Sequence, residues 1–255
     1  MTEAVLALNA GSSSLKFGLF EADPSGANRP PLMLGVLRRQ GDQWLLGARL
    51  AEGGGVEERW PLGGACRPVD RLLDWLQSQF LHVRLTVVGH RIVHGGTEFS
   101  DPIEVDESVL ERLDALTPLA PLHQPMGLEP LRRIRALEPA LRQFACFDTA
   151  FHRTIAPPAG RYALPRRFEA EGIRRYGFHG LADEAMWRRW RQLRPDLIEG
   201  GRVVSVQLGA GCSITAIDRG EAVDTSMGFT PLEVLVMATR CGDVDPGVLL
   251  FLQRK

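Results

Sequence analysis

The sequence predicts an α/β fold with mixed sheets, arranged as two lobes. Apolar runs typical of strands alternate with amphipathic runs typical of helices, and this alternation predicts a layered structure of sheets and helices. An apolar strand, a Gly/Ser turn and a second strand at residues 5–20 have a counterpart at residues 203–217. The similarity of these two segments suggests a duplication, but it could also arise by chance, since Gly-rich hairpins are common. We expect a first lobe over residues 1–150 and a second over residues 151–255.

The first lobe is expected to begin with a hairpin whose turn, residues 9–14, exposes hydroxyl and backbone N–H groups. The strands expected in this lobe cover residues 5–8, 15–20, 32–37, 44–50, 85–88 and 144–147. The expected helices cover residues 69–80, 107–116 and 126–137, the first with its leucines on one face.

The second lobe is expected to contain strands at residues 203–208, 214–217 and 222–225. Pro231 should begin a short apolar helix that ends near Gly242, since proline favours helix starts and glycine helix ends. A last apolar helix at residues 248–252 has no packing partner after it. The chain therefore has the pattern of a C-terminally truncated protein, inactive by itself and only marginally stable in its second half.

The composition is that of a globular protein, and its net charge gives no indication of a strongly charged partner. The net charge of −1 argues against binding to nucleic acid or an anionic membrane. No apolar window is long enough to cross a membrane, and no basic segment precedes the first apolar run, so we expect a cytoplasmic protein. The four cysteines form no CxxC pair and are expected to be free, buried thiols.

Three expected strand ends carry side chains that suit anions or metal ions. Residues 9–16, NAGSSSLK, offer hydroxyl and N–H groups to phosphate oxygens, although such a segment is often only a turn. Arg91 is expected just past a buried strand, where open α/β sheets bind ligands. The alternative is that Arg91 is a solvated surface arginine without a ligand. Asp148 follows another strand and suits magnesium, or else a helix cap.

Two motifs in the second half add to this chemistry. Residues 176–180, YGFHG, have glycines on both sides of Phe178 and His179, which lets the backbone approach a ligand closely. Arg240 lies at the expected end of a helix, where its guanidinium can offer two hydrogen-bond donors to an anion.

The sequence of residues 224–246, which contains DTSMGFTPLE and then TRCGDVDP, closely resembles that of the acetate kinase family. The resemblance extends back to residue 5. It covers only the N-terminal part of that family. The family is similar to sugar kinases, actin and heat-shock ATPases. The resemblance therefore implies duplicated ribonuclease H-like (actin-like ATPase) lobes, the second incomplete.

The resemblance also implies a role for each matching residue. Those with implied catalytic roles are Asp148, His179 and Arg240. Those implied to bind acetate are Arg91, Val93, Leu122, Phe178 and Pro231. Those implied to bind phosphate or ATP are Asn9, Ser12, Lys16, His123, Gly209 and Gly211. Asn9 and Asp148 would bind Mg²⁺ or Mn²⁺.

The chain departs from the family at a few positions. Gln124 stands where the family has asparagine, and Gln207 and Ala210 replace histidine and asparagine in a His-Leu-Gly-Asn-Gly loop. The family's adenosine pocket, second Gly-rich loop and magnesium-binding glutamate have no counterpart in these 255 residues.

The implied reaction is direct in-line phosphoryl transfer from ATP to acetate, giving acetyl phosphate and ADP. Such transfer needs positioning and charge neutralisation, and acetate is already ionised at neutral pH, so no general base is required. The alternatives are a propionate kinase and an inactive remnant that binds acetate or phosphate. The expected partners are acetate, ATP and, in the full-length form, a second copy of the chain.

Overall fold

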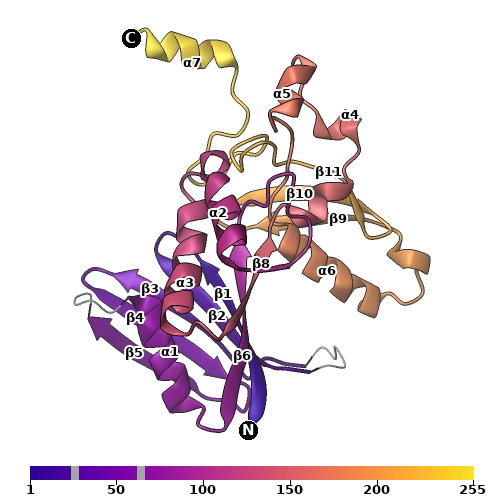
Figure 1. Cartoon of the computed structure of the whole chain (residues 1–255). Helices are drawn as coiled ribbons and strands as arrows, with labels where there is room; N and C mark the ends of the chain where they lie inside the picture. The colour runs from indigo at the N-terminus through magenta and orange to yellow at the C-terminus, as the bar shows by residue number, and fades with distance from the viewer. Residues whose placement is uncertain (24–28, 62–66) are drawn as a thin grey trace. The chain divides into compact units, whose positions relative to one another are not determined.

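The computed structural model of the chain describes residues 1–23, 29–61 and 67–255, which form two sheets with flanking helices (Figure 1). The chain divides into two compact units. The first comprises Met1–Ile92 and Pro102–Cys146, and the second comprises Val93–Asp101 and Phe147–Lys255. The expected lobe limits, residues 1–150 and 151–255, stay a prediction.

The first unit is built on an eight-stranded sheet in the order β5-β4-β3-β2-β1-β6-β8-β7. Its strands are β1 (Thr2–Ala10), β2 (Ser14–Glu21), β3 (Met33–Gln40), β4 (Gln43–Leu50), β5 (Gly55–Pro61), β6 (Val83–Ile92), β7 (Ile103–Glu104) and β8 (Arg142–Phe147). Strands β1 to β5 pair in antiparallel succession, whereas β1 pairs with β6 in parallel, so the sheet is mixed.

Alternation of side chains explains the core of this unit. Ala4, Leu6 and Leu8 of β1 are buried, because a strand directs every second side chain to the same face. Leu72 and Leu76 of α1 (Pro68–Gln79) belong to the same apolar cluster. The other helices are α2 (Glu107–Ala115), α3 (Gln124–Leu137) and the 3₁₀ helix η1 (Thr117–Leu119).

The second unit contains a three-stranded antiparallel sheet in the order β11-β10-β9. Its strands are β9 (Arg202–Leu208), β10 (Cys212–Asp218) and β11 (Glu221–Thr225). Its helices are α4 (Pro157–Gly160), α5 (Arg166–Ala170), α6 (Gly180–Leu193) and α7 (Pro246–Gln253), with the 3₁₀ helices η2 (Ala150–Thr154) and η3 (Ile198–Gly200). None of the helices in the described part of the chain is both long and apolar enough to span a membrane.

Most elements expected from the sequence are present, and the expected α/β class with mixed sheets is confirmed. The helix expected after Pro231 is wrong, since residues 231–240 are irregular and end in a bridge between Met237 and Arg240. Here the backbone bonds elsewhere: Val234 N donates to Asp243 Oδ1, 2.8 Å away. Such long-range contacts take the place of helical hydrogen bonds.

The expectation for the cysteines is also partly wrong. Cys146, Cys212 and Cys241 form no disulfide among the described residues, as expected, but Cys146 and Cys212 are only half-buried and Cys241 is exposed. Cys66 lies outside the described residues.

Candidate functional site

Asn9 and Arg91 form the first cluster of expected site residues, and both belong to the first unit. The parallel register pairs Leu8 with His90, which brings Asn9 and Arg91 together one position further on. Arg91 Nη1 donates to Asn9 Oδ1 across 3.0 Å. The expectation that Arg91 lies past its strand is wrong, because β6 continues to Ile92. The guanidinium is instead fixed by a neighbouring strand.

The Gly/Ser turn joins β1 to β2 as expected. Gly11 N donates to Ser14 O across 2.8 Å, Ser12 is exposed, and Lys16 pairs with Asn9 in the strand register. Side chains directly opposite one another share a face, so Asn9 and Lys16 lie on the same side of the sheet. Their role towards phosphate stays a prediction.

The proline-stiffened turn before α3 presents two further expected residues. Leu122 is 75% exposed. His123 is half-buried and lies immediately before the first residue of α3. An exposed leucine in a stiff turn contributes little to the core of its own unit and is open to contact with a ligand.

In the second unit, the YGFHG segment packs closely against η2 and its neighbours. Gly180 N donates to Asp148 O across 2.8 Å, and a Cβ on Gly180 would lie only 2.3 Å from that oxygen. Gly177 has φ +72°, and a Cβ there would lie 2.6 Å from the His152 ring. Both glycines therefore permit close packing of protein on protein, and the close ligand contact expected from the sequence stays a prediction.

His179, the Gly-rich turn and Arg240 lie together in the second unit. The His179 Nδ1 atom lies 2.9 Å from Ser213 Oγ. A Cβ on Gly211 would lie 3.3 Å from His179 Cε1 and 3.5 Å from Arg240 Nη1. Arg240 Nη1 also donates to Pro231 O across 2.9 Å, which fixes the guanidinium beside another expected residue. The arrangement offers a histidine edge and a cation beside a Gly-rich turn, which suits an anionic group.

Val93 belongs to the same unit as Phe178 and is 7% exposed. The next residue, His94, has its ring centroid 5.7 Å from that of Phe178 and 4.4 Å from that of Tyr176. Burial lowers the pKa of His94 from 6.5 to about 4, so its ring is neutral at neutral pH. His94 is therefore a structural ring between Val93 and the YGFHG segment.

Sequence reasoning missed the residues that support this segment. His152 Nε2 lies 2.9 Å from Phe178 O. Buried Asp183 accepts hydrogen bonds from Ser205 Oγ and Thr215 Oγ1 across 2.6 and 2.8 Å. A partial signal was present in β10, where Ser213 and Thr215 place hydroxyl groups at alternate positions and therefore on one face of the strand.

The donor chemistry of the expected metal ligands fits magnesium. Asp148 is 2% exposed, and Asn9 contributes an amide oxygen; hard cations prefer such oxygen ligands. Among the described residues, no group of three or more His, Cys, Asp or Glu side chains is arranged to hold a metal ion. Asp148 and Asn9 belong to different units, and their role towards a metal ion stays a prediction.

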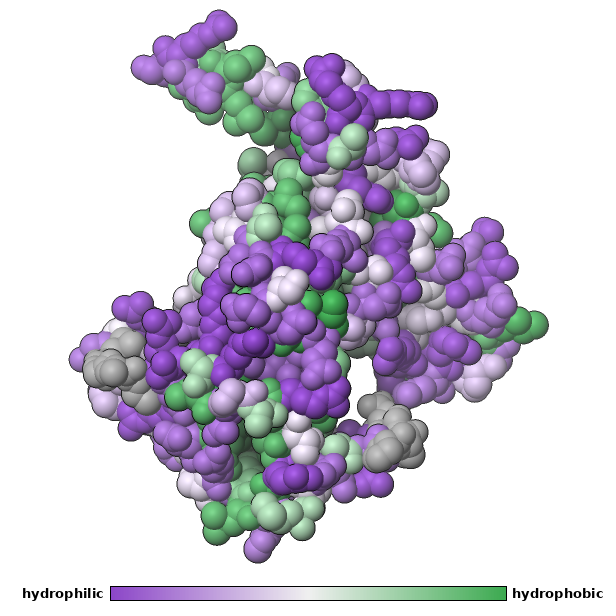
Figure 2. All heavy atoms as spheres, viewed as in Figure 1, coloured by the Kyte–Doolittle hydropathy of each residue, from purple (hydrophilic) through white to green (hydrophobic). Residues whose placement is uncertain are grey.

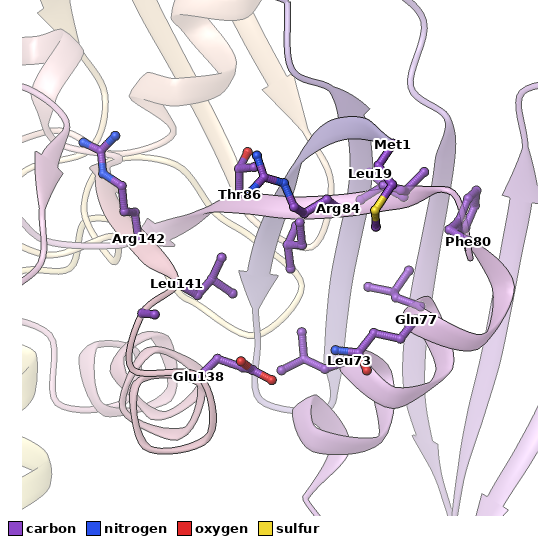
Figure 3. A pocket seen from close by; sticks show the side chains of 14 residues that line it. Met1, Leu19, Leu73, Gln77, Phe80, Arg84, Thr86, Glu138, Leu141 and Arg142 are labelled. Atoms are coloured by element: carbon purple, nitrogen blue, oxygen red, sulfur yellow. The ribbon is translucent and has the colours of Figure 1, made fainter.

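A pocket of about 470 Å³ in the first unit holds none of the expected site residues. It is lined largely by apolar side chains of α1, β6 and the segment after α3, including Leu73, Phe80 and Leu141 (Figure 3). The two arginines at it already bind carboxylates, Arg84 that of Glu3 and Arg142 that of Glu104. Its chemistry does not match a phosphoryl-transfer site.

Comparison with known proteins identifies the family. The model of the acetokinase family matches residues 4–255. The chain belongs to the acetokinase family. The acetate kinase of Methylocella silvestris is 42% identical over 264 residues, which cover 100% of this chain and 65% of that protein. The acetate kinase of Nitrobacter hamburgensis is 41% identical, with 98% of this chain and 62% of that protein covered.

Solved structures of the family agree with the fold. A propionate kinase from Francisella tularensis superposes with a TM-score of 0.86 at 34% identity, covering 99% of this chain and 64% of that one. The acetate kinase of Porphyromonas gingivalis superposes with a TM-score of 0.82 at 36% identity, with the same coverage. The family resemblance and the actin-like fold class expected from the sequence are confirmed. This acetokinase chain spans a little under two thirds of the length of these relatives, and the roles of its individual residues stay predictions.

Proposed function

We propose that this chain contributes the acetate-binding and phosphoryl-binding residues of an acetate kinase, which converts ATP and acetate to ADP and acetyl phosphate. The observation that carries the proposal is the arrangement of His179 and Arg240 around Gly211. Two acetate kinases at about 40% identity support the choice of substrate. ATP and acetate are thus the proposed partners, and a homodimer in the cytoplasm is proposed for the full-length enzyme.

The mechanism assigns charge neutralisation to the arginines. Arg240 is fixed by Pro231 O, and Arg91 by Asn9 Oδ1. Fixed guanidinium groups can bind the carboxylate and the spread negative charge of the transferring phosphoryl group without reorganising. Magnesium or manganese, for which Asp148 and Asn9 are the proposed ligands, would neutralise further phosphate charge.

The histidine has a separate positioning role. Ser213 Oγ holds His179 Nδ1, and the opposite ring edge faces Gly211. A ring held at one nitrogen presents the other in a defined direction, so His179 can bind a phosphoryl oxygen during in-line transfer. Val93, Leu122, Phe178 and Pro231 are the proposed contacts of the acetate methyl group.

Two alternatives have specific support. A propionate kinase is favoured by the structural similarity to the Francisella tularensis protein. An inactive remnant that binds acetate or phosphate is favoured by Gln207 and Ala210, which replace a ring and an amide in the Gly-rich loop. Both residues are exposed, so neither substitution is explained by packing.

Acetate-dependent formation of acetyl phosphate from ATP, trapped as hydroxamate, tests the proposal. It should be measured on this chain and on a fusion of this chain with the C-terminal third of the Methylocella silvestris acetate kinase. We expect turnover from the fusion, lowered about 10²–10³-fold by Arg240→Ala. Arg166→Ala, an exposed arginine of α5, is the control and should keep parental turnover.

Each other outcome identifies an alternative. A fusion that binds acetate without turnover would support the remnant. Higher efficiency with propionate than with acetate would support the propionate kinase. Near-normal turnover of Arg240→Ala would remove Arg240 from the site.

A further inference from the structure

A small polar cavity in the second unit lies among residues that the proposed kinase site does not use. It has a volume of about 170 Å³ and is lined by residues of the loop after β6, of η2 and of the segment before Phe178. The lining residues that matter here are Thr97, Thr149, His152, Arg153, Arg174 and Arg175. None of the expected catalytic, acetate-binding or ATP-binding residues lines it.

The charge at this cavity is positive. Three arginines line it, and no carboxylate does so among the described residues. Arg175 already binds Glu233, 2.7 Å away, and Arg153 lies 3.9 Å from exposed Asp101. Half-buried Arg174 has no carboxylate partner within the described part of the chain. At least one guanidinium charge at the cavity is therefore not balanced locally, which favours an anion.

His152, one of the residues that line this basic cavity, has a hydrogen-bond acceptor that no described residue uses. Its Nε2 faces Phe178 O, which can only accept, so Nε2 carries the proton and Nδ1 is an acceptor. Burial lowers the pKa of His152, which keeps this neutral form. The Nδ1 atom is buried and has no hydrogen-bond partner among the described residues. A buried polar atom without a partner is unusual in a folded protein and calls for a donor.

The size of the cavity limits the ligand. A water molecule occupies about 30 Å³ of liquid, whereas sites for drug-sized ligands measure about 300–1,000 Å³. The cavity of about 170 Å³ therefore accommodates a tetrahedral oxyanion with a few waters, but not a nucleotide.

We propose that this cavity binds a small protonated oxyanion of the phosphate class, with its charged oxygens on Arg174 and Arg153 and its O–H donated to His152 Nδ1. Monohydrogen phosphate carries both kinds of group, whereas sulfate at neutral pH carries acceptors only. His152 Nε2 also donates a hydrogen bond to Phe178 O. A ligand bound at Nδ1 of the same ring would therefore restrict the motion of the ring and, through it, of the YGFHG segment. The proposal does not depend on kinase activity.

Titration with inorganic phosphate, monitored by the ¹⁵N resonances of the histidine rings, tests the site. The His152 signal is assigned by its loss in His152→Gln. In the parent we expect phosphate to shift the Nδ1 resonance of His152, and sulfate to bind at least about tenfold more weakly. Arg174→Gln should weaken the phosphate effect about tenfold or more, while Arg166→Gln, an exposed control, should leave it unchanged.

One further variant separates this site from the proposed kinase site, which also attracts phosphate. Arg240→Gln should remove any phosphate effect at His179 and keep the effect at His152. The proposal is wrong if phosphate leaves the His152 resonance unmoved, or if sulfate acts equally well. It is equally wrong if Arg174→Gln responds as the parent does, or if the effect at His152 disappears with Arg240→Gln.

Discussion

Val93 is a buried valine beside His94, whose ring contacts Phe178 and Tyr176. If Val93 contacts the acetate methyl group, Val93→Ala should enlarge the acyl pocket and shift preference towards propionate. A methylene in an apolar pocket is worth about 1–3 kcal/mol, so the ratio of kcat/KM for the two acids should change by about 10–200-fold. The measurement requires a form with turnover, such as the fusion described above.

Val109→Ala provides the control for this change. Val109 is 5% exposed in α2 of the first unit, so its truncation removes similar buried volume elsewhere. The two variants should lose comparable stability, and only Val93→Ala should change the acid preference. Equal preference in Val93→Ala and its parent would exclude Val93 from the pocket.

His90 links stability to pH. It is buried beside the Gln143 side chain, 2.9 Å away, and burial lowers its pKa from 6.5 to about 4. Above about pH 6.5 its ring is neutral in both states, so the full stability is present. As the pH falls below this value, the unfolded chain takes up a proton that the folded chain refuses. The free energy of unfolding should therefore decrease by up to about 1.4 kcal/mol per pH unit for this histidine.

Urea unfolding at several pH values between 7.5 and 5.5 measures this slope. His90→Gln should remove the contribution of one histidine, so its stability should fall less steeply with acid than that of the parent. His82→Gln, at an exposed position, is the matched control. An unchanged slope in His90→Gln would mean that burial of His90 is not a source of acid sensitivity.

At the scale of elements, the start of α6 depends on a glycine. Gly180 is the first residue of α6, and a Cβ there would lie 2.3 Å from Asp148 O and 2.9 Å from Phe151 Cβ. Gly180→Ala must therefore move a backbone carbonyl, and overpacking of this kind costs about 1–3 kcal/mol. Thermal unfolding should show this loss. In Gly209→Ala the new Cβ would meet only Gly211 O at 3.6 Å, an ordinary contact, so its midpoint should stay near that of the parent.

Equal midpoints for these two glycine variants would contradict the close packing of α6 on Asp148. A second readout is the near-ultraviolet signal of Trp187 in α6, which should change with Gly180→Ala because the helix start moves. Trp187 is buried against Gly200 and Gly220.

Elements with a regular apolar pattern could be predicted from the sequence, and those with a polar interior could not. The leucines of α1 recur on one face, so its pattern predicts the helix directly. Helix α6 was missed because its buried side chains include Asp183, which two hydroxyl groups of the sheet satisfy. Strand β5 was missed because it carries three consecutive charged residues, Glu57 to Arg59, and ends at Pro61, as edge strands can do.

The candidate site shows the same division. Short sequence motifs identified the family and the segments around Arg91, His179 and Arg240. It did not identify His152 or Asp183, because their roles depend on partners more than twenty positions away, such as Phe178 O and Ser205 Oγ. Long-range contacts that no local pattern records decide how the YGFHG segment is held.

At the scale of the whole molecule, the two sheets differ in how well they are covered. In the first unit, β1 buries Ala4, Leu6 and Leu8 against a large cluster. In the second, Val204, Val206 and Leu208 of β9 are 64%, 50% and 76% exposed. Their apolar face is therefore in water, although Ser205 on the opposite face is buried against Asp183.

Helix α7 extends this apolar exposure. None of its residues is buried, and Val248–Leu252 are 45–61% exposed (Figure 2). A helix of eight residues without tertiary packing is marginal in water. The exposed sheet face and α7 each present apolar side chains to water, which favours association.

Hydrogen–deuterium exchange of this chain should report the difference between the two units. Amides of β1, β2 and β6 should exchange slowly, because they lie within a large sheet with a packed core, and local opening there approaches global unfolding. Amides of β9 to β11 should exchange faster, because their small sheet has one exposed apolar face, and those of α7 should show little protection. Measurement at several protein concentrations is the control, since self-association would protect β9 and α7 only at high concentration. Slow exchange through both sheets and α7, independent of concentration, would show that the second unit is as stable as the first.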